Sequence, residues 1–432
     1  MKERSRRGCV LALGLLMAAA AWAQTKVVVM SDIHVMAKEL VVNDSPAWQK
    51  KVAKDRKLFE YSREVLDVMT EQLLREKPDL ILISGDLTKD GEMLSHQYVV
   101  RQLDKLRAAG IRSYVIPGNH DLGTSQSKIF DGETTRQAEV ADSRAFASLY
   151  AHYGYGEGSE RDPESLSYCC EPVEGLVLIG IDSGSNGQLK GTTLQWLTER
   201  AQKATKAGKR VVAMMHHALV PHFNSVDKLM PGSVVGNYET VRDRLSDAGV
   251  QVVLTGHFHV SDIARDFTSD LSRSIYDVAT GSTITYPCDY RRLTFSSDFS
   301  ELQITTDHIT TLPSQPEYKA IARERLFNGA AALVGSRLKN NTLCMMVAGA
   351  MIVHAEGNED QSEEAADFVN TYKFGKSMLK SNTSLLDKLA QQGLSLDLLE
   401  NILMSIMTDR TSYGIEGRED KTDDLQLNIK FF

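Results

Sequence analysis

The chain has 432 residues, of which 42% are hydrophobic and 25% are charged, so it is long enough for one large globular domain and a smaller one. Its formal net charge is -8 at pH 7, and the charge becomes more negative once the basic residues 1–23 are set aside. Such an acidic chain lacks the basic footprint that polymeric nucleic acid requires, although a small phosphate ester is not excluded as a partner.

The amino terminus has the layout of an export signal. Residues 1–7 are basic, residues 10–21 are apolar and small, and Ala21-Trp22-Ala23 precedes Gln24 as an A-x-A-like cleavage site. We therefore predict a signal peptide over 1–23 and an exported protein, periplasmic or extracellular, without a stable membrane anchor. An anchor that stays attached is disfavoured because the apolar run is short for a bilayer. Arg6 and Arg7 resemble the start of a twin-arginine signal, so the general secretory route and the twin-arginine route both stay open.

Four cysteines follow this segment: Cys169, Cys170, Cys288 and Cys344. An oxidising compartment permits disulfides, and four cysteines allow three pairings between which the sequence does not choose. Free buried thiols are the alternative, because a chain of this length does not need disulfides to fold.

Five short apolar runs each end in residues that can bind a metal ion. The five runs are residues 27–30, 80–83, 114–117, 211–215 and 252–255. The first is followed by Asp32 and His34, the second by Asp86 and the third by Asn119 to Asp121. The fourth is followed by His216 and His217, and the fifth by His257 and His259. Helical spacing between several of the runs, such as the apolar positions of 58–74, predicts crossover helices and hence a parallel sheet. Because ligands on such sheets gather at the carboxyl ends of the strands, we expect the five ends to converge.

The segments around these runs complete a predicted catalytic domain. Residues 35–54 and 221–236, the latter with His222, are predicted as loops that either line the site or lie on the plain surface. The runs 166–172 and 176–181 predict paired strands, and the runs 274–279, 291–295 and 302–306 predict a second, antiparallel sheet. Asp182 follows one more apolar run, but the turn residues after it favour a structural carboxylate.

Near Pro313 and Pro316 the pattern becomes helical. Helices are predicted over 321–338, around the aromatic residues Phe368, Tyr372 and Phe374, and over 385–394 and 398–407. The apolar stretch 343–354 is too short to span a membrane, so it is predicted to form the core of a small bundle with them. From Thr408 the chain turns polar and acidic and carries little sign of structure. We therefore divide the chain into the signal peptide 1–23, a catalytic domain 24–312 and a helical domain 313–432.

The polar residues at the five strand ends have the composition of a two-metal centre. Mixed imidazole and oxygen ligands suit Mn, Fe or Zn, and they are too many for one four-coordinate ion but enough for two ions that share a carboxylate. The candidate ligands are Asp32, His34, Asp86, Asn119, His216, His257 and His259. Two such ions can hold a hydroxide that attacks phosphorus. His120 is left over, and we predict that it donates a proton to the leaving oxygen while Asp121 orients its ring.

In chain order these motifs resemble the five signature blocks of the calcineurin-like metallophosphoesterases, over residues 25–307. The blocks are Asp32-x-His34, Gly85-Asp86, Gly118-Asn119-His120-Asp121, His216 and Gly256-His257-x-His259. The resemblance implies an α/β fold, a four-layer α-β-β-α sandwich of two mixed sheets. It also implies that Asp32, His34, Asp86 and His259 hold the first ion, and that Asp86 as the bridge, Asn119, His216 and His257 hold the second, with His217 behind the ligands.

Within that superfamily, Lys89 stands where purple acid phosphatases carry a tyrosine ligand, so that branch is disfavoured. The layout as a whole resembles bacterial secreted cyclic-nucleotide phosphodiesterases, which implies hydrolysis of small cyclic nucleotides. The alternatives are a phosphomonoesterase, an enzyme acting on phospholipid head groups, and a non-catalytic scaffold of the same fold. The sequence leaves the native metals, the exact substrate and the oligomeric state open.

Overall fold

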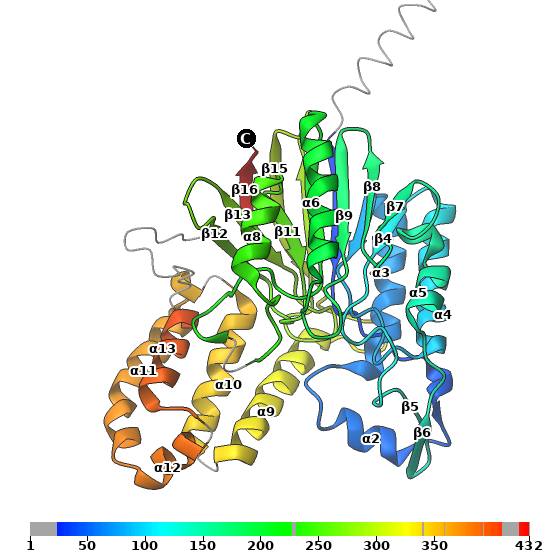
Figure 1. The fold of residues 1–432 in the computed structure, drawn as a ribbon. Coiled ribbons are helices and arrows are strands. Elements are labelled where there is room, and N and C mark those ends of the chain that lie inside the picture. The colour runs from blue at the N-terminus through cyan, green and yellow to red at the C-terminus, as the bar shows by residue number, and fades with distance from the viewer. Residues whose placement is uncertain are drawn as a thin grey trace, which may run out of the picture.

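The computed structural model describes residues 24–226, 230–338, 341–357, 359–391, 393–407 and 423–431. The predicted signal peptide over 1–23 lies outside these residues. Within them, two large mixed sheets pack face to face, and helices cover their outer faces (Figure 1).

The first sheet has six strands in the order β16-β15-β14-β1-β3-β4. Strands β1, β3 and β4 run parallel, and β14 continues the sheet antiparallel to β1. The strands are β1 (Thr25–Met30), β3 (Leu80–Ile83), β4 (Arg112–Val115), β14 (Asp289–Phe295), β15 (Glu301–His308) and β16 (Gln426–Lys430).

The second sheet has seven strands in the order β12-β13-β11-β10-β9-β8-β7. Its central strands β9, β10, β11 and β13 run parallel, with antiparallel strands at both edges. The strands are β7 (Ser159–Arg161), β8 (Tyr168–Val173), β9 (Leu176–Ile181), β10 (Arg210–Met215), β11 (Val252–Thr255), β12 (Asp262–Phe267) and β13 (Ser274–Ala279). The predicted pairing of the strands around 166–172 and 176–181 is confirmed by β8 and β9.

Helices on both sides make four layers. On the first sheet these are α3 (Ser62–Glu76) and α4 (Met93–Ala108), and on the second they are α6 (Gly191–Lys206) and α8 (Tyr238–Asp247). The helical spacing that predicted α3 places Val65, Leu66, Met69 and Leu73 in the core. The predicted α-β-β-α sandwich is therefore confirmed. A short helix, α5 (Ser143–Leu149), lies in the connection after β4.

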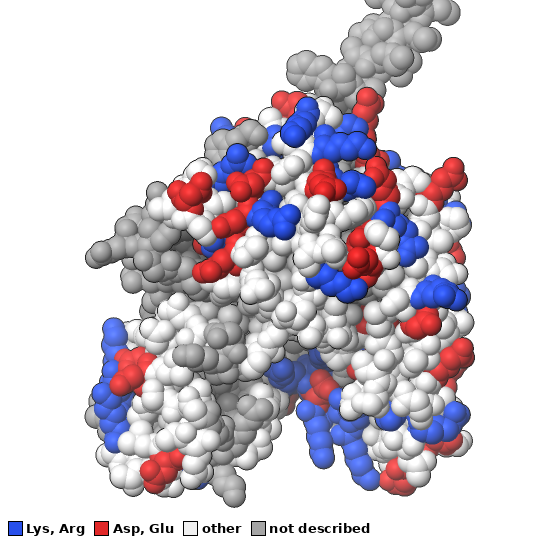
Figure 2. All heavy atoms as spheres, in the orientation of Figure 1, with Lys and Arg blue, Asp and Glu red and all other residues white. Residues whose placement is uncertain are grey.

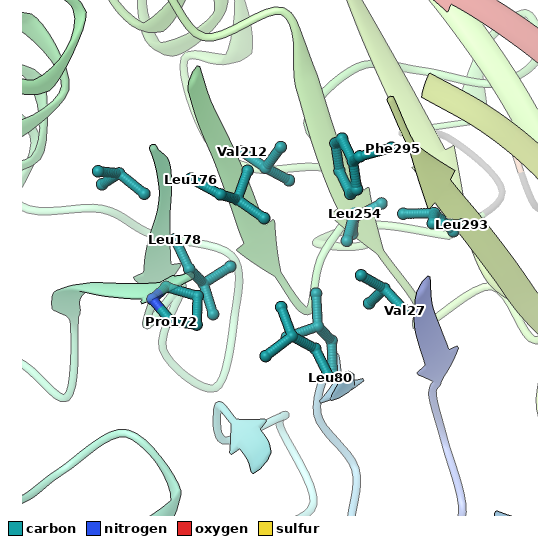
Figure 3. Close-up of a pocket in the computed structure, with 11 residues that line it drawn as sticks. Val27, Leu80, Pro172, Leu176, Leu178, Val212, Leu254, Leu293 and Phe295 are labelled. Atoms are coloured by element: carbon teal, nitrogen blue, oxygen red, sulfur yellow. The ribbon is translucent and has the colours of Figure 1, made fainter. Parts of the chain in front are cut away.

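The interior between the sheets is apolar. Figure 3 shows side chains from β1, β3 and β14 facing side chains from β9, β10 and β11 around a pocket with only apolar lining. Such a space offers no group that could hold a polar substrate, so we assign it to the core. All four described cysteines are free thiols, and Cys170, Cys288 and Cys344 among them are buried.

The predicted separate antiparallel sheet is wrong. The run 274–279 is β13, which lies parallel to β11, whereas the runs 291–295 and 302–306 are β14 and β15 of the sheet that contains β1. The apolar pattern identified these strands but could not assign them to a sheet, because strand partners are set by tertiary packing.

A third, small sheet lies beside the main body. It has the order β2-β5-β6, with β2 (Val41–Val42), β5 (Lys128–Asp131) and β6 (Thr134–Gln137). Next to it stands α2 (Pro46–Val52), which begins where the Ser45 side chain accepts a hydrogen bond from Trp48 N at 3.2 Å. The residues around 35–54, predicted as a loop, thus contain short elements of their own.

The predicted helical region near the carboxyl terminus is confirmed. It comprises α9 (Tyr318–Leu338), α10 (Asn341–Glu356), α11 (Glu363–Lys380), α12 (Thr383–Gln391) and α13 (Leu396–Met407). The prediction missed β16, which follows these helices and returns to the first sheet beside β15. No helix within the described ranges is both long and apolar enough to cross a membrane.

Candidate metal centre

The predicted ligands lie at the carboxyl ends of strands from both sheets. Asp32 and His34 follow β1, Asp86 follows β3 and Asn119 follows β4, all in the first sheet, whereas the three histidines follow β10 and β11 in the second sheet: His216, His257 and His259. The predicted convergence therefore occurs, but between two sheets and not along the edge of one.

The backbone at these positions is strained. The φ angles of the ligand residues lie in the left-handed region at Asp32 (51°), His34 (40°), Asp86 (51°), His257 (69°) and His259 (63°). Residues other than glycine rarely adopt this conformation unless the surrounding structure holds them there, and such strain gathers at functional sites. Gly118 and Gly256 let the strand ends approach, because a Cβ at either position would collide with the Asp86 or Asp32 carboxylate.

The first group of donors is Asp32, His34, Asp86 and His259, whose candidate ligand atoms all lie within 4.8 Å of one another. Asp32 Oδ1 is 3.1 Å from Nε2 of His259 and 3.7 Å from Nε2 of His34. The two imidazole nitrogens face each other at 3.2 Å. This Asp32 oxygen is buried and has no hydrogen-bond partner, because the other oxygen receives the hydrogen bonds from Ser31 Oγ and from the His257 N–H.

The second group shares Asp86 with the first. Asp86 Oδ2 is 3.5 Å from Nε2 of His34 and 3.3 Å from Nε2 of His216. Asn119 Oδ1 is 3.0 Å from both His216 Nε2 and His257 Nδ1, and those two nitrogens are 3.2 Å apart. Asp86 therefore lies between the groups, as a bridging carboxylate must.

Neighbouring groups orient the imidazoles. Nδ1 of His216 is 2.9 Å from the Ser84 carbonyl and Nδ1 of His34 is 3.3 Å from the Thr88 carbonyl. A carbonyl can only accept, so Nδ1 carries the proton in both rings and Nε2 presents its lone pair to the cluster. Nδ1 of His259 has Thr285 Oγ1 at 3.0 Å.

This arrangement fits metal ions. Lone pairs of several rings and an unpartnered carboxylate oxygen point at one another, which is unfavourable unless a cation lies between them. Burial lowers the pKa of His216, but Asp86 and Asp32 outweigh it and raise the pKa to about 9. The carboxylates thus favour a positive charge here, which a bound cation would supply in place of a proton on Nε2. By contrast, burial and the neighbouring His216 lower the pKa of His257 to about 3. The donor set therefore suits two cations that share Asp86, and the elements Mn, Fe and Zn stay a prediction.

His120 lies beside the cluster and outside it. Its ring contacts His34 edge to face with centroids 5.0 Å apart, and 30% of its side chain is exposed. Its backbone N–H donates to Asp86 Oδ1 at 2.8 Å, which leaves Oδ2 for the two groups of donors. His120 can therefore reach a molecule bound at the centre while it also fixes the bridging carboxylate.

The family model that describes the calcineurin-like phosphoesterases matches residues 25–261, which is more than half of the chain. The chain belongs to this family. The match ends shortly after His259, so it covers every predicted ligand of the candidate centre but none of the carboxyl-terminal helices.

Curated relatives also match the chain in sequence. A probable cyclic nucleotide phosphodiesterase from Synechococcus sp. is 26% identical over 194 residues, which are 43% of this chain and 60% of that protein. A glycerophosphodiester phosphodiesterase from Enterobacter lignolyticus is 28% identical over 156 residues, which are 35% of this chain and 46% of that protein. The match thus spans about half of each relative. Among solved structures, a dimetal phosphatase from Danio rerio covers 65% of this chain and 95% of its own, with a TM-score of 0.47 and 13% identity.

The predicted pairing of Asp121 with the His120 ring is wrong. Asp121 is fully buried, and its carboxylate accepts hydrogen bonds from the N–H groups of Leu87 and Thr88 and, within its own turn, of Gly118. Burial and the nearby Asp86 raise the pKa of Asp121 to about 7. The hydrogen bonds of the Asp121 carboxylate therefore link the loops after β3 and β4, and the His120 ring has a different hydrogen-bond partner.

That partner is Asp90, whose Oδ1 lies 2.8 Å from Nδ1 of His120. Burial raises the pKa of Asp90, but the His120 and Lys89 side chains outweigh it and hold the pKa below its ordinary value. Asp90 is thus a carboxylate at neutral pH that fixes a proton on Nδ1 of His120 and turns Nε2 outward. Its place four residues after Asp86, in the same loop, was the only signal that the sequence offered.

Two further predicted residues have structural partners. His217 packs against the His216 and His257 rings, with centroids 5.3 and 4.6 Å away, and its Nδ1 is 2.7 Å from Ser183 Oγ. Its ring therefore lies behind the ligands. Asp182 accepts hydrogen bonds from the N–H groups at positions 166 and 184, so its prediction as a turn carboxylate is confirmed.

Proposed function

We propose that this protein hydrolyses phosphate esters at the centre formed by the two groups of donors, and that its substrates are phosphodiesters, with small cyclic nucleotides favoured. The observation that carries the proposal is the convergence of three carboxylate or amide oxygens with four imidazoles, next to one histidine that the cluster does not use.

Two metal ions held by Asp32, His34, Asp86, Asn119, His216, His257 and His259 would activate a water molecule and neutralise the charge that develops on the phosphoryl oxygens. Other groups of the protein hold these ligands in the required orientation. The carbonyls behind His34 and His216 hold the imidazole rings in one tautomer, and the His120 N–H holds the bridging carboxylate in one orientation.

His120 is the proton donor in this proposal. Its Nδ1 is occupied by Asp90, so Nε2 is the nitrogen that can protonate the oxygen of the departing alcohol. The ring is partly exposed, unlike the fully buried rings of His34 and His216, so a substrate can reach it. The proton leaves Nε2, the phosphorus–oxygen bond breaks, and the alcohol departs neutral.

The preference for diesters draws support from the two curated relatives, which are named as phosphodiesterases. The decisive experiment compares hydrolysis of bis-p-nitrophenyl phosphate, p-nitrophenyl phosphate and cyclic nucleotides by the protein loaded with Mn²⁺. We expect the diesters to react with the higher kcat/KM. A higher kcat/KM for the monoester would assign the protein as a phosphomonoesterase.

Variants connect this activity to the proposed centre. We expect His120→Ala to lower kcat for cyclic nucleotides, whose leaving alcohol needs a proton, about 10²- to 10⁴-fold, the usual contribution of a general acid. The exposed His152 serves as the matched control, and His152→Ala should retain the activity. If all three substrates stay intact with the metal-loaded protein, or if both variants behave alike, the proposed function is refuted.

A further inference from the structure

Lys57 approaches the metal centre from the segment between α2 and α3. Its Nζ lies 2.9 Å from Nε2 of His34, the nitrogen that faces the cluster, and 5.8 Å from the centre of the Phe59 ring. None of the signature motifs contains this lysine, and the predicted centre makes no use of it. A cation at this place therefore needs an explanation of its own.

The backbone around Lys57 is firmly held. The N–H of Lys57 donates to Asp55 Oδ1 at 3.1 Å, and the N–H of Leu58 donates to the Ile284 carbonyl at 2.8 Å. Leu58 and Phe59 are buried in the core. On the other side, Arg325 of α9 donates to the Val52 carbonyl at 2.7 Å. The backbone that carries the lysine is thus fixed, and the side chain is the part of Lys57 that is free to change position.

The positive charge of Lys57 has carboxylates around it but no direct ion pair. Asp86, Asp32, Asp55 and Asp90 attract this charge through space. Within the described part of the chain, however, no carboxylate oxygen lies within 4.0 Å of its Nζ. Asp55 pairs with Lys51 at 2.7 Å, and Asp90 pairs with Lys89 and His120. A cation that is held in place without an ion pair of its own is suited to an anionic ligand.

From these contacts we propose that Lys57 binds a non-bridging oxygen of the phosphate group that is cleaved. This inference rests on the proposed function. Once the His34 nitrogen serves a metal ion, the ammonium is repelled from it, and an anion at the same centre is the group that can receive its hydrogen bonds. The side chain has the flexible four-carbon stem that such a small shift requires.

The surrounding charges favour the arrival of an anion. Residues 50–57 carry five basic side chains and one acidic side chain, at Lys50, Lys51, Lys54, Arg56, Lys57 and Asp55. Figure 2 shows basic side chains beside a hollow between the carboxyl-terminal helices and the segment with α2. Salt screens the field of an exposed lysine such as Lys54, whereas Lys57 contacts His34 directly, so only the loss of Lys57 should weaken phosphate binding strongly.

The test compares Lys57→Met and Lys57→Arg with Lys54→Met, which removes an equal charge from an exposed position of the same segment. Calorimetry measures the Kd of inorganic phosphate for each metal-loaded protein, and kinetics with bis-p-nitrophenyl phosphate gives KM and kcat. We expect Lys57→Met to raise the Kd and the KM at least about tenfold, as for the loss of a hydrogen bond to a charged group, with a smaller change in kcat. Lys57→Arg should restore part of the loss, and Lys54→Met should change either value less than about twofold.

Several results would overturn the inference. These are an unchanged phosphate Kd in Lys57→Met, an equal effect of Lys54→Met, and a wild-type protein that binds no phosphate. Elemental analysis of each variant adds another, since loss of metal from Lys57→Met would make the lysine a support for the cluster. If the wild-type protein hydrolyses no ester, the proposed function fails by itself, and the calorimetry alone decides on Lys57.

Discussion

Replacing Asp90 by asparagine tests whether the carboxylate that the structure pairs with His120 supports proton donation. The hydrogen bond is 2.8 Å long and joins a carboxylate to Nδ1 of the ring. Hydrogen bonds to charged groups contribute about 1.5–3 kcal/mol, and the 30% exposure of the His120 side chain argues for the lower end of that range. A loss of about 1.5–2 kcal/mol in the transition state corresponds to a kcat that is about 10- to 30-fold lower.

The assay should compare two leaving groups, because nitrophenolate departs without a proton whereas an alkoxide needs one. Asp90→Asn should slow an alkyl diester more than bis-p-nitrophenyl phosphate, at unchanged metal content, and His120→Ala should show the same order. Asp298→Asn, in an exposed turn, provides the control. If Asp90→Asn slowed both substrates equally, or if it had no effect, Asp90 would not act through the proton donor.

Three further predictions concern metal binding and stability. Asp86→Ala should remove metal from both positions, because each group of donors uses Asp86. The control Asp182→Ala should keep its metal, and elemental analysis measures both contents. One ion retained in Asp86→Ala would contradict a shared carboxylate. Burial lowers the pKa of His222, but Asp262 and Asp277 raise it to about 10. A raised pKa in the folded state stabilises the fold fully below about pH 6.5, and this stabilisation is lost as the pH rises toward 10. Urea unfolding at fixed pH values should therefore give a free energy that falls over this range, less steeply in His222→Gln, and equal slopes would contradict the assignment. Ile429→Ala should lower the free energy of unfolding by about 2–4 kcal/mol, since the side chain is 2% exposed in β16, and an unchanged value would mean that β16 does not contribute to the sheet.

The ligand positions could be predicted from the sequence because each follows an apolar run that can only be a buried strand. Parallel strands bring their carboxyl ends together, so Asp32 and Asp86 of the first sheet had to meet once their strands were recognised. His216 follows a strand of the second sheet and meets them because the two sheets pack face to face, which the local pattern did not show.

The partner of His120 could not be found in the same way. Asp121 is adjacent in sequence, but the turn from Gly118 points its carboxylate inward, where it accepts N–H groups of the neighbouring loop. Asp90 comes from 30 residues earlier and meets the ring only because the loops after β3 and β4 are side by side. Side-chain direction at a turn depends on backbone angles that neighbouring residue types do not determine.

Long-range pairing explains the other differences. The strand β14 lies antiparallel to β1 although more than 250 residues separate them, and β16 joins β15 only after the five carboxyl-terminal helices. Because the chain leaves the first sheet at β15 and returns to it at β16, the helices are an insertion into that sheet and not an appended domain. A truncation that removes all residues from Glu317 onward would therefore also remove the edge strand β16. Such a truncation cannot separate an effect of the helices from the loss of this strand, whereas a single substitution such as Lys57→Met leaves the strand in place.

The two-sheet arrangement also bears on how metal binding and folding depend on each other. The first sheet supplies Asp32, His34, Asp86 and Asn119, and the second supplies three histidines, so neither sheet alone offers a complete set of donors. The apolar interior that packs the sheets together sets the distance between the two sets. Ions bound by both sets of donors would connect the sheets at the end where loops, and not core side chains, meet. Their binding would consequently favour the packed state over any state in which the sheets separate, so that metal binding and folding would be coupled.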